Sequence, residues 1–185
     1  MAGRSKSRNK RIKGWFMSGL CPNEYLASID TSNFHSGSRC AHLYPGDNLN
    51  SDESWATLMQ QMKGAEYIGK RLRMSLWVKT KDVTGWVAPW MRVDGIEGRS
   101  SPLSFDNFCT RQIKSTTDWT KYDIVLDVPA GSVNIAFGVM LGGRGDVWID
   151  EFSFEIVSKD VPVTDCPCSS YFRESEEPKN LNFED

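Results

Sequence analysis

The sequence predicts an all-β domain built as a sandwich of two antiparallel sheets. Apolar and polar residues alternate with a period of two along several segments, as in strands that bury one side and expose the other. These segments recur at roughly 8 to 12 residues, with Gly, Pro and Asn turns between them, which is typical of β-sandwiches. No segment shows the period of about 3.6 residues that an amphipathic helix requires.

The clearest strands lie between residues 119 and 157. Apolar residues alternate over 122–128 and 135–141, and a third apolar row covers 147–156. The apolar side of that row changes near Asp150, which predicts a β-bulge there. Because tight loops join antiparallel strands, we expect these three strands to be antiparallel neighbours.

The rest of the chain is predicted to contain further short strands, each ended by Gly, Pro or polar residues. They cover residues 15–17, 25–29, 39–44, 55–62, 70–80, 86–94 and 109–114. A long loop is expected over 95–107.

A chain of 185 residues fits one domain with a sizeable core. Residues 1–13 carry only basic charges and form a flexible leader, residues 14–157 form the sandwich, and residues 158–185 form an extended tail. The leader lacks the apolar core of a secretory signal, and no window approaches the roughly 18 apolar residues of a membrane span. A cytoplasmic protein without membrane contact is therefore expected.

The five cysteines are odd in number and scattered, which favours free, mostly buried thiols over a disulfide framework. Cys166 and Cys168 are separated by one residue and have no second pair, so a zinc site is not favoured. The formal net charge of −2 and a few unpatterned basic residues do not favour nucleic-acid binding.

Several segments together resemble the galactose-binding-like jelly roll of carbohydrate-binding modules. They are HSGSRCAHL (35–43), GKRL (69–72), FDN (105–107), DWTKYDIVLDVP (118–129) and GDVWIDEFSFEIV (145–157). Within that group the chain is similar to accessory modules of AraC-type regulators and of peptidases. The resemblance implies a jelly roll over residues 15–157 and a binding role, but it does not identify the ligand.

One departure from the family concerns the first strand. Related domains begin with an NLxFE-like strand before a GWF segment, whereas here NLNFE closes the chain at 180–184. The segment is therefore expected to supply the first strand, which makes the jelly roll circularly permuted. Two alternatives stay open: the strand is donated to a neighbouring copy as a swapped homodimer, or it hangs loose.

The alternation predicts a ligand-binding face. If the apolar sides of strands 70–80 and 86–94 face the core, their Trp and Arg residues share the opposite face, where indoles can stack on sugar rings and charged groups can bind hydroxyls. The alternative is that these indoles are ordinary packing. The predicted ligand-binding residues are Arg73, Trp77, Trp86, Trp90, Arg92, Asp94, Asn107 and Arg111.

The resemblance also implies a structural calcium ion, because related modules hold calcium with acids of their first and last strands. The matching positions are Asp150, Glu184 and the loop at residues 36–37. The alternative is that these are ordinary surface acids. No other cofactor is expected.

The sequence contains none of the usual catalytic motifs, and its two histidines lie close together near the HSG turn. A non-catalytic binding module for a carbohydrate or similar polar small ligand is therefore predicted. The alternative is an interaction or regulatory module that binds a protein partner.

Overall fold

The computed structural model describes residues 12–96 and 102–165. These residues form strands, two short 3-10 turns and loops, which confirms the all-β prediction. The strands are β1 (Phe16–Gly19), β2 (Tyr25–Asp30), β3 (Cys40–Pro45), β4 (Trp55–Lys63), β5 (Arg71–Asp94), β6 (Ser104–Asp106), β7 (Ile113–Asp127), β8 (Asn134–Gly142) and β9 (Asp146–Val157). In this part of the chain no helix has the length and hydropathy needed to traverse a bilayer.

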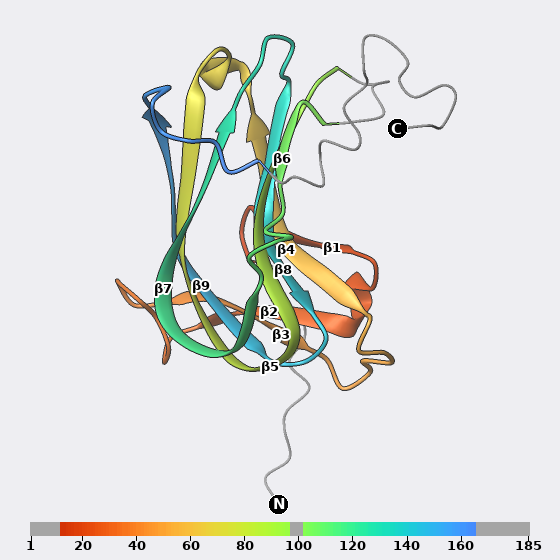
Figure 1. Ribbon diagram of the computed structural model, residues 1–185. Helices are drawn as coiled ribbons and strands as arrows, with labels where there is room; N and C mark the ends of the chain where they lie inside the picture. The colour runs from red at the N-terminus through yellow and green to blue at the C-terminus, as the bar shows by residue number, and fades with distance from the viewer. Residues whose placement is uncertain (1–11, 97–101, 166–185) are drawn as a thin grey trace, which may run out of the picture.

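Strand β5 belongs to both layers of a jelly-roll sandwich. Its residues 71–81 pair with β9, and its residues 86–94 pair with β8. The first sheet therefore has the order β2–β3–β9–β5–β7, and the second has the order β1–β4–β8–β5–β6, with antiparallel pairing throughout. Figure 1 shows β5 descending in one layer, curving at the lower end and rising in the other.

The core lies between the two sheets and is apolar. Alternate residues of β5 and β8 point inward and are fully buried, as their period-two pattern predicts. Burying each such side chain contributes about 1.5 to 3 kcal/mol. The inward residues of these two strands include Leu72, Met74, Leu76, Val78, Ile135, Val139 and Leu141.

The prediction that residues 70–80 and 86–94 form two separate strands is wrong. Residues 81–85 look like a turn in sequence, yet Lys81 pairs with Asp146 and Val83 pairs with Ser115. Register shifts along the β5–β7 ladder and the positive φ of Asp82 (53°) bend the strand without ending it.

The expectation that the last three strands are neighbours is also wrong. β7 pairs with β5, β8 lies between β4 and β5, and β9 lies between β5 and β3. The tight loops cross between the layers and do not close hairpins. The predicted bulge is confirmed, because the β5–β9 register shifts between Ser75 and Trp77, opposite Asp150, and Glu151 has a φ of 51°.

The segment between β5 and β7 differs from its prediction in two ways. A strand, β6, lies within the expected loop, and β7 begins at Ile113, so only the last two residues of the predicted strand 109–114 are in a strand. Cys109 is disulfide-bonded, whereas Cys21 and Cys40 are free. The expectation of free thiols is thus wrong for Cys109, because sequence spacing alone does not reveal which side chains meet.

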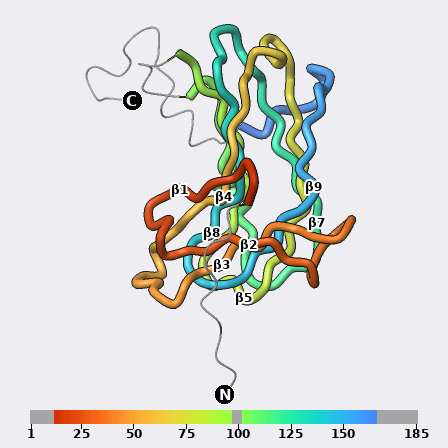
Figure 2. The backbone as a smooth tube through the Cα atoms, turned by 180° about the vertical axis from the view of Figure 1, so that it is seen from behind, coloured from red at the N-terminus to blue at the C-terminus, as the bar shows by residue number. Residues whose placement is uncertain are grey.

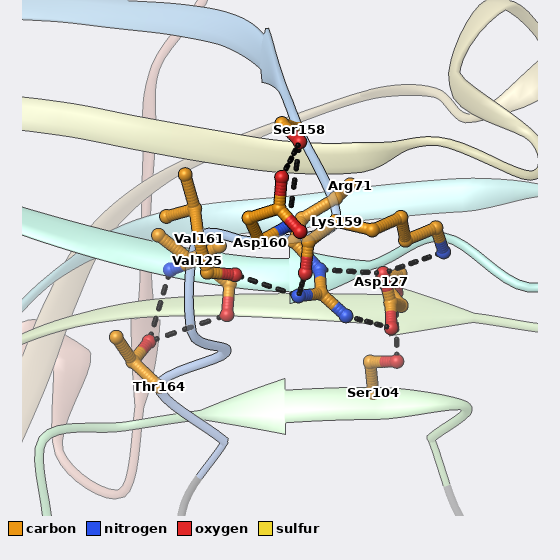
Figure 3. A network of polar contacts seen from close by, with 9 residues as sticks. All are labelled: Arg71, Ser104, Val125, Asp127, Ser158, Lys159, Asp160, Val161 and Thr164. Atoms are coloured by element: carbon orange, nitrogen blue, oxygen red, sulfur yellow. Dashed lines mark hydrogen bonds and ion pairs between the residues drawn. The ribbon is translucent and has the colours of Figure 1, made fainter.

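Residues 158–165 form a strap across the adjoining ends of β5 and β7 (Figure 3). The Arg71 guanidinium donates to the carbonyl oxygens of Lys159 and Val161, each at 2.6 Å, and binds both carboxylate oxygens of Asp127. Beyond it, the Thr164 N–H donates to the Val125 carbonyl at 2.9 Å. The proposed returning strand at 180–184 and most of the basic leader lie outside the described residues.

Candidate functional site

The predicted ligand-binding residues are divided between the two outer faces of the sandwich. Arg73 and Trp77 lie on the outer face of the first sheet, whereas Trp86, Arg92 and Asp94 lie on that of the second. The prediction that they share one face is wrong, because β5 changes layer between them. The outward sides of its two halves therefore point in opposite directions.

On the outer face of the first sheet, Trp77 is covered by a loop residue. The His35 ring stacks on the Trp77 indole with centroids 3.8 Å apart and planes 16° from parallel. The Trp119 ring approaches the same histidine at 5.8 Å. The His35 Nδ1 atom pairs with the Glu151 carboxylate, so the ring that closes over Trp77 is itself held in place.

A second aromatic stack on this face is also occupied by internal contacts. The His42 ring lies 4.8 Å from the Trp148 ring and 4.5 Å from the Tyr44 ring. The Trp148 indole N–H donates to Asp30 at 2.7 Å, and His42 Nε2 lies 2.8 Å from Asp146. Trp148 is 7% exposed, so this stack offers little ring surface to a ligand.

Arg73 adds no free recognition group to the first face. Its guanidinium pairs with the Glu155 carboxylate at 3.3 Å, and its buried Nε atom has no hydrogen-bond partner.

Asp150 contacts the loop that the resemblance indicated, but through groups that do not suit calcium. Its carboxylate accepts the backbone N–H groups of His35 (2.9 Å), Ser36 (3.2 Å) and Glu151 (2.9 Å). Calcium requires six to eight oxygen ligands, whereas this loop presents N–H donors. No metal-binding group of His, Cys, Asp or Glu occurs among the described residues, and Glu184 lies outside them.

On the outer face of the second sheet, two indoles flank a glycine. Trp55 of β4 and Trp86 of β5 both pair with Gly142 of β8, and their ring centroids are 6.5 Å apart. A Cβ added to Gly142 would lie 2.6 Å from Trp86 Cε2, 2.7 Å from Nε1 and 2.9 Å from Cζ2. Because the ring-fusion atom is nearest, the indole lies with one face on the glycine, and the residue as a whole is partly buried.

A buried tyrosine fixes the strand ends that carry this indole pair. The Tyr25 hydroxyl lies 2.6 Å from the Ser54 carbonyl oxygen and 3.0 Å from that of Gly143. Burial raises the pKa of Tyr25 to about 12, so the hydroxyl remains a protonated donor at neutral pH. The start of β4 and the end of β8 are thereby tied together beside Trp55 and Gly142.

Trp90 lies in the middle of the second face but is buried there. It is 6% exposed and packs with Met59 and Ala136. Its indole N–H donates to the Thr57 hydroxyl at 2.8 Å. Trp90 forms the floor of this face, so its assignment as an open stacking residue is corrected.

The other end of the second face is polar. The Arg92 side chain is 44% exposed and binds the Asp94 carboxylate through Nε at 2.7 Å and Nη2 at 3.2 Å. The Asn134 amide donates to the same carboxylate at 3.0 Å. Phe105 of β6 pairs with Arg92, and the half-exposed Phe16 of β1 pairs with Met59.

Asn107 and Arg111 follow the edge strand β6 and are not brought beside Trp77. Arg111 forms an ion pair with the fully buried Asp106, and its guanidinium carbon lies 3.8 Å above the Phe108 ring. These contacts fold the loop. The Asn107 Oδ1 atom is buried without a hydrogen-bond partner.

Sequence reasoning missed Trp55, Phe16 and the role of Gly142. Trp55 was placed in a strand, but its nearness to Trp86 depends on both strands pairing with β8. The available signal was a glycine inside a strand pattern, which marks close approach of another group to the backbone.

Comparisons with known proteins support this architecture. No protein-family model matches the chain. Its sequence is 42% identical over 176 residues to an uncharacterized HTH-type transcriptional regulator, YbfP, of Bacillus subtilis (strain 168). The match covers 95% of this chain and 58% of that protein, so the chain spans little more than half of the curated relative's length.

Solved structures with the same fold include carbohydrate-binding modules. The CBM22-1 xylan-binding domain of Paenibacillus barcinonensis Xyn10C superimposes with a TM-score of 0.55 and 14% identity, covering 79% of this chain and 87% of that one. The C-terminal family 22 module of Clostridium thermocellum Xyn10B gives 0.54 and 10%, covering 82% and 91%. The enzymatically active domain of bacteriophage CBA120 tailspike protein 4 gives 0.58 and 15%, covering 80% and 20%. The resemblance to carbohydrate-binding modules is therefore confirmed for the fold.

Proposed function

We propose that this domain is a non-catalytic carbohydrate-binding module whose ligand binds on the outer face of the second sheet. The observation that carries the proposal is the indole of Trp86, which lies flat on Gly142 beside Trp55. A flat ring on a sheet gives the planar apolar surface on which a sugar ring stacks. Two structural neighbours with this fold are xylan-binding or ligand-binding modules by description.

The ligand that best fits this face is an oligosaccharide. Trp86 and Arg92 lie on the same side of β5, about 20 Å apart along the strand at roughly 3.3 Å per residue. One sugar unit stacks on the indole pair, and further units reach the polar end, where Arg92, Asp94 and Asn134 bind hydroxyl groups. Between these two ends, the oligosaccharide passes over the buried Trp90.

Binding without hydrolysis is the favoured activity. A glycosidase needs two carboxyl groups about 5 to 10 Å apart across the ligand. Among the described strand residues that point outward from the second sheet, Asp94 supplies the one carboxylate. That group is bound by Arg92 and Asn134, which suits orientation of a ligand.

The regulator relative suggests how such binding is used. In this proposal the domain senses a carbohydrate inside the cell for a transcriptional regulator with an HTH element. A second candidate is a protein partner on the same face, because Phe16 and Leu20 at its β1 edge are 44% and 66% exposed. A protein would use this apolar edge, whereas an oligosaccharide would not require it.

A glycan array followed by calorimetry tests the proposal. We expect the unmodified chain to bind at least one oligosaccharide, and Trp86→Ala to weaken that binding about thirtyfold, as for loss of an aromatic anchor worth roughly 2 kcal/mol. Trp119→Ala, on the other face, is the matched control and should leave affinity unchanged. If no glycan on the array binds, the carbohydrate proposal fails and the protein-partner candidate takes precedence.

A further inference from the structure

A cavity of about 250 Å³ lies beside the first sheet, between its strands β3 and β9 and the segment before β1. It occurs where the first sheet narrows: β3 pairs with β9 only over residues 147–149, and β9 continues past the end of that pairing. Figure 2 shows β2 and β3 at the lower end of the molecule, with the upper part of β9 extending above them. Residues of β2, β3, β4, β9 and the segment before β1 line the cavity.

The lining of the cavity is mostly apolar. Leu58 and Ile149 contribute from the two sheets, and Trp15 and Phe152 form an aromatic wall with ring centroids 5.0 Å apart. Trp15 also packs edge-on against Phe137 at 5.7 Å. The turn before it is fixed, because the Trp15 N–H donates to the Ile12 carbonyl at 3.0 Å. The site is therefore largely formed before any ligand enters.

The rim of the cavity carries one cation and two acids, and the acids are already engaged. Asp150 accepts three backbone N–H groups, and Glu151 pairs with His35. Arg39, by contrast, is exposed and forms no ion pair with any residue in the described ranges. The rim thus leaves a guanidinium available, and a guanidinium binds carboxylates with two parallel hydrogen bonds.

A cysteine in the wall does not suggest covalent chemistry. Burial, with Asp150 and Asp30 nearby, raises the pKa of Cys40 to about 12. The thiol therefore stays neutral and donates to the Asn33 carbonyl. Reversible binding is the activity that this cavity supports.

We propose that this cavity is a second ligand site, which takes a small aromatic carboxylic acid with its ring against Trp15 and Phe152 and its carboxylate on Arg39. The volume lies between that of an apolar cavity of about 150 Å³, which accepts benzene, and the roughly 300 Å³ at which ordinary ligand pockets begin. A single aromatic ring with a short acidic arm matches that size. This site is separate from the sugar-binding proposal and does not rest on it.

The position of the site gives it a consequence for the rest of the domain. The walls of the cavity include the segment before β1 and strand β3. Strand β3 follows the loop whose backbone N–H groups donate to Asp150. A ligand that fills the cavity would hold both against β9 and so stabilise the fold by mass action.

Calorimetric titration with three probes of similar size tests the proposal. Phenylacetate should bind more tightly than neutral 2-phenylethanol, and cationic phenethylamine should bind most weakly. Arg39→Gln should reduce phenylacetate affinity at least tenfold, to about that of 2-phenylethanol, because only the charged contact is lost. Since Arg39 is exposed, this variant is expected to fold normally.

Ala41→Phe, which fills the cavity, should abolish binding of all three probes, and a melting curve checks that it folds. Trp86→Ala should leave phenylacetate binding unchanged, which separates this site from the sugar-binding face. The proposal is overturned if phenylacetate does not bind at millimolar concentration, if a folded Ala41→Phe still binds it, or if Arg39→Gln binds it as well as the unmodified chain.

Discussion

The two outer faces of the sandwich carry similar residues but arrange them in opposite ways. On the first sheet, Trp77 lies under His35 and Trp148 lies against His42, so internal partners cover the rings. On the second sheet, Trp86 packs with one face on Gly142 and is partly buried. The two faces thus differ in what packs against each ring: loop and strand histidines on the first sheet, a backbone glycine on the second.

The polar groups of the two outer faces also differ in what they bind. On the first face, Asp30, Asp146 and Glu151 bind the aromatic rings or the loop that covers them. On the second face, Arg92 and Asp94 bind one another near the surface. Each face also carries an ion pair at its surface, Arg73–Glu155 on the first and Arg92–Asp94 on the second, so the faces differ mainly in the carboxylates that bind the aromatic rings of the first.

The largest expected effect comes from changing Gly138 of β8, which packs closely against β4 in the second sheet. A Cβ at position 138 would lie 2.3 Å from the Leu58 carbonyl oxygen and 2.9 Å from Met59 Cα. Because backbone atoms cannot move away easily, Gly138→Ala should lower the free energy of unfolding by about 3 kcal/mol. Chemical denaturation measures this, with exposed Ser153→Ala on the first face as the control. Equal stability of the two variants would contradict the close packing described for β4 and β8.

A somewhat smaller effect is expected from the polar network of the first face. Burial raises the pKa of Asp30, but hydrogen bonds from the Ser32 N–H, the Trp148 indole and Asn33 outweigh it and lower the pKa from 3.8 to about 2. Because the folded-state pKa is depressed, this stabilisation is complete above about pH 4 and is lost as the pH falls toward 2. Asp30→Asn should therefore cost about 2 kcal/mol at neutral pH.

Denaturation at several pH values checks that prediction. The difference in stability between the unmodified chain and Asp30→Asn should shrink as the pH falls from 4 to 2. Asp52→Asn, at an exposed ion pair with Arg144, is the control and should show no such trend. A stability difference for Asp30→Asn that stays constant with pH would show that the carboxylate charge is not what anchors Trp148.

The smallest effect is expected from the exposed ion pair of the first face. Arg73 and Glu155 have 29% and 67% of their side-chain surface exposed, so solvent and salt screen their attraction. Arg73→Ala should change the free energy of unfolding by no more than about 0.5 kcal/mol and should leave glycan affinity unchanged. Loss of glycan binding in Arg73→Ala would indicate that the ligand binds on the outer face of the first sheet, which would contradict the proposal.

The sequence predicted which side chains point inward, but not the layer to which each strand belongs. Alternation correctly placed Leu72, Met74 and Leu76 in the core, because that pattern is local. It did not show that β5 continues through residues 81–85, since the Lys-Asp-Val-Thr-Gly segment looks like a turn and is held by pairing with distant strands. The separation of Trp77 from Trp86 follows from that one continuous strand.

The candidate site was predictable only as a set of residue types. Trp86 was named from its place in an alternating strand, but its orientation depends on Gly142, which lies far along the chain. Trp90 obeys the same alternation and is nevertheless buried, because it packs with Met59 and Ala136 and donates to Thr57. Period-two patterns indicate the side of a strand, whereas exposure on that side depends on residues contributed by other strands.

The most direct test of the glycan-face proposal follows the indole N–H resonances of the seven tryptophans during titration with a glycan that binds. The signals of Trp55 and Trp86 should shift with saturation, whereas those of Trp77, Trp119 and Trp148 should stay in place. Movement of the Trp77 and Trp119 signals without those of Trp55 and Trp86 would contradict the account.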